Sequence, residues 1–401
     1  MLRIGLTGGI AAGKSLAAQR LVQLGATLID ADALAREVVK PGSEGLRAVA
    51  DAFGPGILDD DGGIDRAALG AMVFDNPDQR GRLNAIVHPL VRARAGELAE
   101  AAGEDAVVVQ DIPLLVETGQ STSFHLVLVI DAPEEERLRR MMEERGMSEA
   151  DARSRIAAQA SRGERNNAAD VVLENTGPRE ELLSALDQLW EERLKPFNQN
   201  LLDGALAPRS GPPVLVDPKP EWATQAELLA GRIHRSDTRI QAVDHVGSTA
   251  VPDMPAKDVL DLQVTVASLD DADAAAGNLA AAGFPHWPGI GRDTPKPSHP
   301  DPADWGKRLH GNADPGRKAN VHVRVHGSPG WRYALAFRDW LRDQPEMAAV
   351  YLAEKQRLAE LHATDASTGR YAREKEEWFS GFADRQLNEW IENTGWRPRS
   401  G

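Results

Sequence analysis

Short apolar runs recur along the first half of the chain and alternate with segments whose apolar positions have helical spacing. The runs occupy residues 2–7, 26–30, 106–110, 124–130 and 171–173. Strands that alternate with helices predict a parallel, doubly wound α/β sheet. Ligands of such sheets bind at the carboxyl ends of the strands. We therefore expect a site near the acidic residues that end three of the runs, Asp30, Asp111 and Asp131.

The spacing between these runs predicts several helices, some with clear start or stop signals. Asp65 is placed to cap one helix, and Pro41-Gly42 stops another. At His88-Pro89 a new helix can begin, with proline in its first turn. The other expected helices cover residues 31–39, 43–53, 65–73, 134–145, 148–160 and 179–194.

Helical periodicity is lost after this region, and proline and glycine accumulate up to Pro213. Such a composition is typical of a linker. We therefore predict a first domain over 1–195, a linker over 196–213 and a second domain over 214–401. A helix over 221–233 is expected near the start of the second domain.

The first apolar run leads into a glycine-rich loop of the pattern G-x-x-x-x-G-K-S, followed by an apolar face at helical spacing. This context predicts a P-loop, whose backbone N–H groups surround phosphates. Lys14 is expected to reach the β- and γ-phosphates of a nucleotide, and the Ser15 hydroxyl to bind Mg²⁺. The predicted nucleotide-binding residues of the loop are Gly8, Gly9, Ile10, Ala11, Ala12, Gly13, Lys14, Ser15 and Leu16.

Two further features suit phosphoryl transfer. Asp30-Ala31-Asp32 follows the second run, and a carboxylate here could accept the proton of an attacking hydroxyl. We favour Asp32 for this role, with Asp30 as a metal or supporting ligand, although one of them could be only a helix N-cap. The segment 134–145 is rich in arginine and glutamate, which predicts either a basic lid over the nucleotide or a solvated helix face.

Composition limits the function classes. The 46 basic and 61 acidic residues give a formal net charge of −15. This charge argues against a general binder of nucleic acid or of anionic membranes. There is no cysteine, so disulfides and cysteine zinc sites are excluded. No apolar run is long enough for a membrane span, and the chain enters its first strand without a signal peptide, so we expect a cytoplasmic protein.

The first half resembles the dephospho-coenzyme A kinase family. The P-loop alone is common to many kinases, but the order of the further motifs is more specific. These motifs are Ile29-Asp30-Ala31-Asp32 with Ala35-Arg36, Pro41-Gly42, Asp65-Arg66, Leu83-Asn84 with His88-Pro89, Asp111-Ile112-Pro113-Leu114-Leu115 with Glu117, and Ala169-Asp170 with Asn175 and Gly177. The resemblance implies ATP-dependent phosphorylation of the ribose 3′-hydroxyl of dephospho-coenzyme A, with Mg²⁺, in a P-loop kinase fold with a helical lid.

The resemblance also implies roles for individual residues. Asp32 is the implied catalytic base, Lys14 the phosphate ligand and Arg140 the first lid arginine. At the position of the family's second lid arginine this sequence has Glu144, and Arg145 follows one place later. Asn175 and Gly177 match a loop on the adenine side of the nucleotide. The implied acceptor-binding residues are Asp32, His88, Asp111, Pro113, Leu114, Leu115 and Glu117, and the alternative for His88 is a buried structural role.

The second half resembles the GrpB-like family, which implies an α+β fold of the nucleotidyltransferase type. The matching segments include Asp244 to Pro252 and Lys257 to Val264. Active nucleotidyltransferases hold metal with two carboxylates two residues apart on a strand, but here Gln263 stands two residues after Asp261. We therefore expect a non-catalytic domain with a structural, folding or interaction role. A nucleotide-binding site at Gly247-Ser248 with Lys257 is the alternative.

Two other functions stay open at this point. The first half could be another small-molecule P-loop kinase, for example one that acts on nucleosides or nucleotides. Alternatively, the main role of the protein could be binding or assembly through residues 214–401. The sequence does not determine the oligomeric state.

Overall fold

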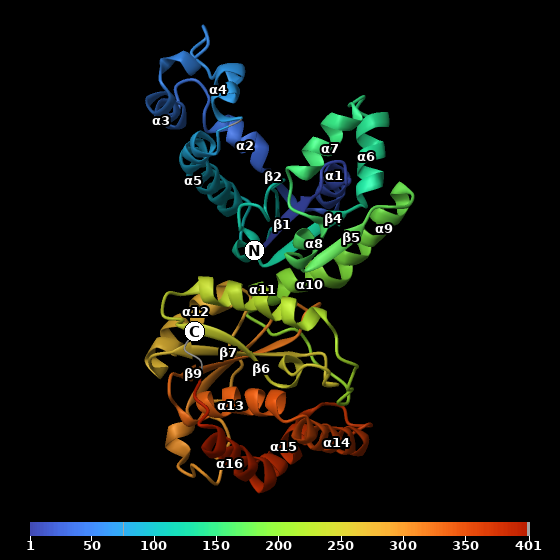
Figure 1. Cartoon of the computed structure of the whole chain (residues 1–401), viewed down its shortest axis with the longest axis vertical. Coiled ribbons are helices and arrows are strands. Elements are labelled where there is room, and N and C mark those ends of the chain that lie inside the picture. Colours follow the sequence, from blue (N-terminus) through green and yellow to red (C-terminus); the bar gives the residue numbers. More distant parts are fainter. Residues whose placement is uncertain (75, 399–401) are drawn as a thin grey trace. The chain divides into compact units, whose positions relative to one another are not determined.

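The computed structural model describes residues 1–74 and 76–398 and divides the chain into two compact units, Met1–Trp190 and Glu191–Gly401 (Figure 1). Each unit has its own sheet and its own core. No helix in the described part of the chain is both long enough and apolar enough to cross a membrane.

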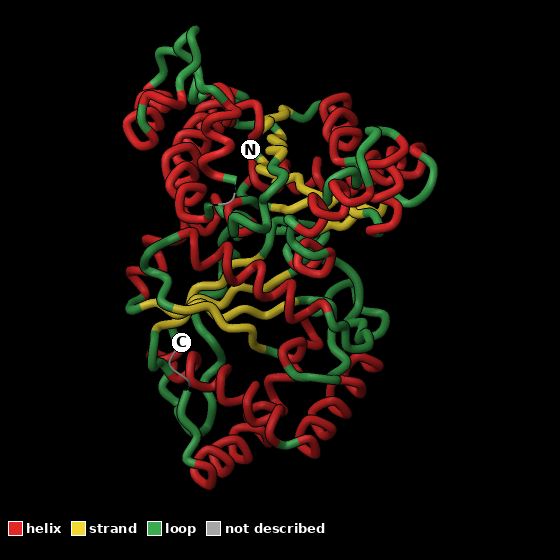
Figure 2. The backbone as a smooth tube through the Cα atoms, turned by 45° about the horizontal axis from the view of Figure 1, so that its top comes forward, coloured by secondary structure: helices red, strands yellow, loops and turns green. Residues whose placement is uncertain are grey.

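The first unit contains a five-stranded sheet in the order β2-β3-β1-β4-β5, in which all neighbouring strands are parallel. This confirms the predicted α/β class. Figure 2 draws the strands in yellow and the helices in red. The central strands are buried along almost their whole length, as expected for a parallel sheet covered on both faces. The strands are β1 (Leu2–Gly8), β2 (Thr27–Asp30), β3 (Val107–Asp111), β4 (Leu126–Asp131) and β5 (Val171–Glu174).

The register of this sheet brings the predicted site residues together. Asp30, at the end of β2, is the pairing partner of Asp111, at the end of β3. Leu6 of β1 pairs with Asp111 from the opposite side of β3. The glycine-rich loop begins at Gly8, two residues after Leu6. The carboxyl ends of three neighbouring strands therefore meet at one edge of the sheet.

The helices of the first unit follow the expected positions closely. Ser43 and Asp65 cap α3 and α4 through their side chains, which accept hydrogen bonds from backbone N–H groups of the first turn. The helices are α1 (Lys14–Leu24), α2 (Ala31–Glu37), α3 (Glu44–Phe53), α4 (Arg66–Val73), α5 (Pro77–Ala101), α6 (Glu134–Glu143), α7 (Glu149–Ala157), α8 (Arg162–Asn167) and α9 (Arg179–Leu189).

Helix α5 corrects one prediction. It runs without interruption from Pro77 to Ala101, so His88-Pro89 lies inside a helix and does not begin one. Proline in a helix interior removes one backbone hydrogen bond, at a cost of about 3 kcal/mol. Apolar side chains on both sides of Pro89 pack into separate buried clusters, which offsets this loss: Leu83, Ile86 and Val87 before it, and Val91, Ala95 and Ala99 after it.

The predicted linker needs a second correction. A π-helical turn over Trp190–Leu194 leads directly into α10 (Lys195–Asp203), so the first part of the expected linker is helical. Leu194 and Phe197 are buried in the second unit, three residues apart on one face. Pro196 stands in the first turn of α10, where proline is tolerated. The proline-rich composition therefore misplaced the boundary, and the irregular part begins at Gly204.

The second unit holds a four-stranded mixed sheet in the order β6-β7-β9-β8, in which only β7 and β9 run parallel. This confirms the predicted α+β class. Helices α11 and α12 share a buried cluster with β7 and β9. The strands are β6 (Ala242–Val246), β7 (Leu260–Val266), β8 (Lys307–Gly311) and β9 (Ala319–Val325); the helices after α10 are α11 (Glu221–Ser236), α12 (Leu269–Ala281), α13 (Pro329–Asp343), α14 (Pro345–Leu361), α15 (Gly369–Trp378) and α16 (Asp384–Thr394).

Candidate functional site

The loop between β1 and α1 has the backbone shape of an anion-binding loop. Ala11 (φ 61°) and Gly13 (φ 102°) adopt left-handed conformations, which are rare for residues with a side chain. Strained backbone of this kind occurs at ligand sites, where successive N–H groups turn toward an anion. Lys14 and Ser15 begin α1, and the first N–H groups of a helix have no carbonyl of a preceding turn to bind. The loop therefore fits the phosphates of a nucleotide.

Neighbouring side chains hold this loop in place. The Asn175 side chain donates from Nδ2 to the Ala12 carbonyl over 2.8 Å. Gln159 Oε1 accepts a hydrogen bond from the Ile10 N–H at 2.8 Å. Arg140 donates from Nη1 to the Ala11 carbonyl at 3.3 Å and from Nη2 to the Asn175 carbonyl at 2.8 Å. Asn175, which the family resemblance places on the adenine side, thus also holds the loop through the Ala12 carbonyl.

Arg137 is a close neighbour of the loop that the sequence motifs did not single out. Its side chain is only 4% exposed, and a Cβ atom at Gly9 would lie 2.5 Å from its Nη1. Among the described residues, its Nε and Nη1 atoms have no hydrogen-bond partner. Burial, followed by the charge of Arg165, lowers the pKa of Arg137. A buried guanidinium with unused donors against the loop fits a bound phosphate group.

Arg165 is a second buried arginine in this region, at 2% exposure. Its Nη1 donates to the Ala160 carbonyl, while Nε and Nη2 have no partner within the described residues. It lies on α8, a six-residue helix that we did not predict. The sequence signal was present, because Ser161 and Glu164 form a capping box.

The two lid arginines differ in their surroundings. Arg140 is tied to the loop carbonyls and to Glu136 Oε1, which it contacts over 2.8 Å. Helix α6 ends at Glu143, and Arg145 lies exposed beyond it. Arg140 thus holds the loop through hydrogen bonds, and no corresponding contact of Arg145 is found among residues 1–74 and 76–398.

We predict that Arg140→Ala lowers kcat/KM for ATP by on the order of 10-fold, because the loop loses hydrogen bonds from a charged donor. Arg145→Ala is expected to stay within about 2-fold, as for an exposed charge. Steady-state kinetics with varied ATP measures both variants. Arg140→Lys keeps the charge but cannot bridge both carbonyls, so full recovery in this variant would contradict the positioning role.

Three carboxylates lie at the ends of β2 and β3 and in the first turn of α2, and their contacts differ. Asp30 accepts a hydrogen bond from the Ala33 N–H at 2.9 Å and caps α2, so the N-cap alternative holds for this residue. Asp111 forms an ion pair with Lys14. Asp32 is exposed in the first turn of α2, and no hydrogen bond to its carboxylate is found in the described part of the chain. Asp32 is therefore the carboxylate that is free to accept a proton.

Electrostatics couples these groups. Burial raises the pKa of Asp111, the Lys14 ammonium opposes this, and the nearby charges of Asp30 and Asp32 raise it further. The ion pair with Lys14 keeps a cation next to the carboxylates in the absence of nucleotide. A phosphate on the loop would offer Lys14 a second anionic partner.

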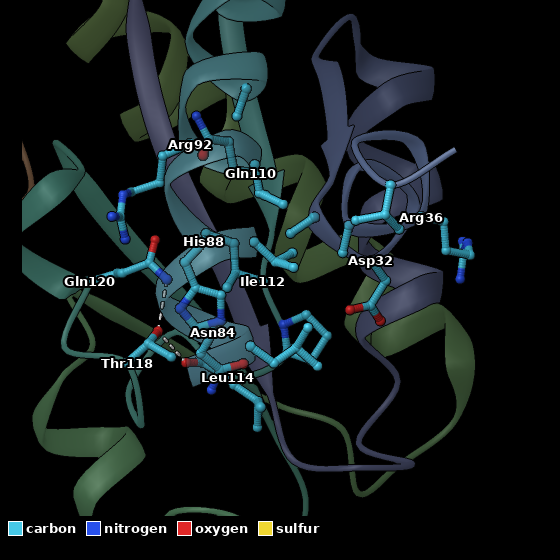
Figure 3. A pocket seen from close by; sticks show the side chains of 18 of the residues that line it. Asp32, Arg36, Asn84, His88, Arg92, Gln110, Ile112, Leu114, Thr118 and Gln120 are labelled. Atoms are coloured by element: carbon cyan, nitrogen blue, oxygen red, sulfur yellow. Dashed lines mark hydrogen bonds between the residues drawn. The ribbon is translucent and has the colours of Figure 1, made fainter. Parts of the chain in front are cut away.

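A cavity of about 470 Å³ opens beside Asp32 (Figure 3). Its walls come from α2, α4, α5 and the segment after β3. Ile29, Ile64, Leu69, Val87 and Val91 supply much of its apolar surface. Of the predicted acceptor residues, the cavity is lined by Asp32, His88, Pro113 and Leu114. Six further polar residues line the cavity: Arg36, Asn84, Arg92, Gln110, Thr118 and Gln120. Arg36 and Asn84 belong to the motifs quoted for the family resemblance but were not assigned to the site, and the other four were not noted in the sequence.

His88 faces this cavity from the middle of α5 (Figure 3). Burial, with a further contribution from the Arg92 charge, lowers its pKa. Its imidazole is therefore neutral at physiological pH and can accept a hydrogen bond from a ligand. Arg36 and Arg92 add positive charge to the cavity, which suits a ligand that carries phosphate.

The other predicted acceptor residues lie elsewhere. Leu115 is fully buried against Phe124 in the core under the sheet, so the structure does not bring it to the cavity. Glu117 is exposed and accepts a hydrogen bond from the Ala160 N–H at 2.8 Å, which ties its segment to the one before α8. Asp111 pairs with Lys14 instead of lining the cavity. Gly177 lies against Glu181, where a Cβ atom would collide with the carboxylate.

No group of three or more histidine, cysteine, aspartate or glutamate side chains within residues 1–74 and 76–398 could hold a metal ion. The exposed Ser15 hydroxyl, at the start of α1, is the oxygen that the loop presents beside the phosphate position. A Mg²⁺ ion bound mainly by substrate phosphates and one hydroxyl fits such a site, because Mg²⁺ keeps several water ligands.

In the second unit, Gln263 replaces the second metal-binding carboxylate, as the sequence indicates. It is fully buried; its Nε2 donates to the Trp331 carbonyl at 3.1 Å, and its Oε1 accepts from Arg324 at 2.8 Å. Both ends of the amide are thus used within the fold. The side chain is a structural residue of the sheet.

Comparisons with known proteins agree with this division. The family model described as "Dephospho-CoA kinase" matches residues 2–181, and the model described as "GrpB protein" matches residues 212–385. A relative from Mycolicibacterium paratuberculosis called "Dephospho-CoA kinase" is 49% identical over 99% of this chain and 100% of its own length. A relative of the same name from Streptomyces avermitilis is 53% identical but covers only 48% of this chain and 94% of its own length. One solved structure, TT1252 from Thermus thermophilus, is 36% identical with a TM-score of 0.43 and covers 48% of this chain and 97% of its own.

Proposed function

Because the chain belongs to the dephospho-CoA kinase family, we propose that it transfers the γ-phosphoryl group of ATP to the 3′-hydroxyl of dephospho-coenzyme A, in the cytoplasm. The observation that carries the proposal is the position of the free Asp32 carboxylate. It lines the 470 Å³ cavity and lies near Asp111, the ion-pair partner of Lys14. An acceptor in the cavity and a nucleotide on the loop would then meet at Asp32.

In this mechanism the acceptor hydroxyl oxygen forms a bond to the γ-phosphorus, and the bond from that phosphorus to the bridging oxygen breaks, releasing ADP. Asp32 orients the hydroxyl and takes its proton. Lys14 leaves Asp111 to bind the β- and γ-phosphates, and Arg137 donates to the charge that moves between them. Mg²⁺, held in part by Ser15, supplies further charge neutralisation when it is bound.

The cavity supports an acceptor with both apolar and anionic parts. Its apolar wall suits a ring or a chain, and Arg36 and Arg92 suit phosphate groups. His88 offers a neutral acceptor for a hydroxyl or an amine. These features agree with a phosphorylated nucleoside carrying a long substituent, which is the chemical class of dephospho-coenzyme A.

An acceptor panel tests the proposal against another small-molecule kinase activity. Purified full-length protein is incubated with ATP and Mg²⁺, and ADP release is measured with dephospho-coenzyme A, adenosine, AMP and shikimate. We expect ADP release with dephospho-coenzyme A alone. A nucleoside or nucleotide as the best acceptor would establish the alternative instead.

We predict that Arg137→Ala lowers kcat/KM for ATP on the order of 30-fold, the effect of losing a hydrogen bond from a charged donor. Arg139 on the same helix is the matched control. It is exposed and pairs with Glu136 and Glu143, so Arg139→Ala should change activity by less than about 2-fold. Equal effects of the two substitutions in steady-state kinetics would show that α6 acts only as a charged surface.

For the second unit we propose no nucleotidyl transfer. Supporting this, the Gln263 amide is fully used in the core and Arg324 is bonded to it. The relative from Streptomyces avermitilis, which covers only the first half of this chain, indicates that the kinase chemistry does not require this unit. We therefore assign catalysis to the unit Met1–Trp190 and a separate role to Glu191–Gly401.

A further inference from the structure

The second unit contains a cavity of about 220 Å³ that the kinase reaction does not use. Part of its wall is aromatic, with Tyr333, Phe337, Tyr351 and Phe379 among the lining residues. Ser248 and Lys375 are among the polar residues that line it, and no hydrogen bond of either side chain is found in the described part of the chain. A concave site with aromatic walls and a few converging polar groups is typical of small-molecule binding.

Two of the acidic groups in this cavity are already neutralised by the protein. Asp293 accepts hydrogen bonds from Arg324 Nε at 2.7 Å and from Lys307 Nζ at 2.5 Å. Glu376 pairs with Lys296 at 2.6 Å. These carboxylates therefore offer no open ligand position for a cation. Arg324 also donates a hydrogen bond to Gln263, so its guanidinium connects Asp293 with Gln263 on this side of the cavity.

The third acidic group, Asp261, is outnumbered by positive charge. It accepts a hydrogen bond from Asn320 at 2.7 Å and lies 3.5 Å from His322 Nε2. Four basic side chains interact with it electrostatically: Arg209, Lys257, Lys355 and Lys375. We call these four residues the basic cluster. One carboxylate cannot balance four cations, in a chain whose overall charge is strongly negative.

Within the basic cluster, Lys257 and Lys375 have no ion pair or hydrogen bond in the described part of the chain. Their ammonium groups lie over the ring of Tyr371, at 5.1 and 5.7 Å from its centroid. Lys355 has a backbone partner, the Pro255 carbonyl at 2.6 Å. Arg209 donates to Asn320 and to the Ala319 carbonyl. Neutral groups thus hold the basic cluster in place.

The pKa values of two lysines in the basic cluster reflect their burial and the positive charge around them. Burial, and then repulsion from Lys375, lower the pKa of Lys257 to about 8 and that of Lys355 to about 7. Burial also acts to lower the pKa of Lys375, but Tyr351, Tyr371 and Asp261 hold it above its usual value. An anion in the cavity would relieve the repulsion between these lysines.

We propose that this cavity binds the phosphate group of a small phosphorylated metabolite, without a divalent cation. Lys375 meets the phosphate and Ser248 donates to it, Lys257 adds positive charge next to Lys375 from outside the cavity lining, and the aromatic wall holds the rest of the molecule. This cavity has less than half the volume of the cavity in the first unit. Its size therefore favours a small sugar phosphate or organic phosphate over a complete nucleotide. Because Asp293 and Glu376 are already paired with basic side chains, neither is open to join Asp261 in holding a bridging metal ion.

Calorimetric titration with inorganic pyrophosphate in the presence of EDTA tests the proposal. The titration uses the full chain with Lys14→Ala, which weakens binding at the glycine-rich loop. We expect a site in the second unit to remain in this background, and the Lys375→Met variant separates it from any binding at Arg36 and Arg92 of the first unit. Adding Lys375→Met should weaken that site at least about 10-fold, and adding Lys257→Gln should have a similar effect. The matched control adds Lys195→Met, which changes an exposed lysine of the same unit and should leave the binding intact.

Two measurements keep the outcome decisive. Thermal midpoints of all variants identify any that fail to fold, and Lys257→Gln then serves in place of Lys375→Met. Loss of all binding in the Lys14→Ala chain would overturn the proposal, because the glycine-rich loop would be the sole site. Equal affinities in the Lys375→Met and Lys195→Met chains, or binding that appears only after Mg²⁺ is added, would also overturn it. None of these results depends on kinase activity, so failure here would leave the kinase assignment untouched.

Discussion

Lys14→Ala is expected to lower phosphoryl transfer by about 10²- to 10³-fold, the scale of removing one preorganised charged donor. Lys14 is the first residue of α1, and its ammonium reaches the carboxyl end of β3, where it pairs with Asp111. The loop amides alone cannot replace this charge on the β- and γ-phosphates. Removing Lys14 also leaves the half-buried Asp111 without its cation, which adds repulsion to an incoming phosphate.

A coupled assay for ADP with dephospho-coenzyme A as acceptor measures this loss. Lys40→Ala is the matched control, because Lys40 is an exposed lysine of the same unit, and its activity should stay within about 2-fold of the unchanged protein. Turnover of the Lys14→Ala variant within a few-fold of the unchanged protein would remove the glycine-rich loop from the mechanism.

The parts of this site that could be predicted are those in which local sequence determines local shape. The loop from Gly8 to Ser15 has such a pattern, since the strand before it, the glycine in a left-handed conformation and the helix after it all follow from nearby residues. Asp32 was predictable for the same reason, because it follows a strand and begins a helix.

The residues that were missed depend on contacts between distant segments. Arg137 belongs to a helix rich in both charges, and its sequence neighbours do not show that it is the buried arginine against Gly9. Leu115 carries a family motif, yet tertiary packing places it in the core. Helix α5 was divided at Pro89 because the local rule for proline is strong, whereas the apolar contacts on both sides of it are visible only in three dimensions.

In the second unit, the sequence identified the loss of a metal-binding carboxylate at Gln263 but not its structural consequence. The amide is bonded to Arg324, and Arg324 in turn neutralises Asp293. The residues of the basic cluster are separated by up to 166 positions in the sequence, from Arg209 to Lys375, so no local pattern could show that they meet. Their convergence is a property of the fold.

Asp32→Asn is expected to lower kcat by about 10²-fold and to leave KM for ATP nearly unchanged. The amide keeps the shape of the side chain but cannot take a proton from the acceptor hydroxyl. A larger loss is not expected, because phosphoryl transfer needs only modest help from a base and Asp32 contributes in part by orienting the hydroxyl. Nucleotide binding depends on the loop and on Lys14, neither of which bonds to Asp32.

Two neighbouring carboxylates allow this assignment to be separated from a general charge effect. Asp30→Asn removes a negative charge from the same edge of the sheet. It retains the N-cap of α2, because asparagine caps helices as well as aspartate does. Its kcat should therefore fall by less than about 3-fold. Asp111→Asn leaves Lys14 without its ion-pair partner and should alter KM for ATP as well as kcat. Normal kcat in Asp32→Asn with a strong loss in Asp111→Asn would assign the base to Asp111. Similar losses in all three variants would mean that the edge acts through its total charge and that no single carboxylate receives the proton.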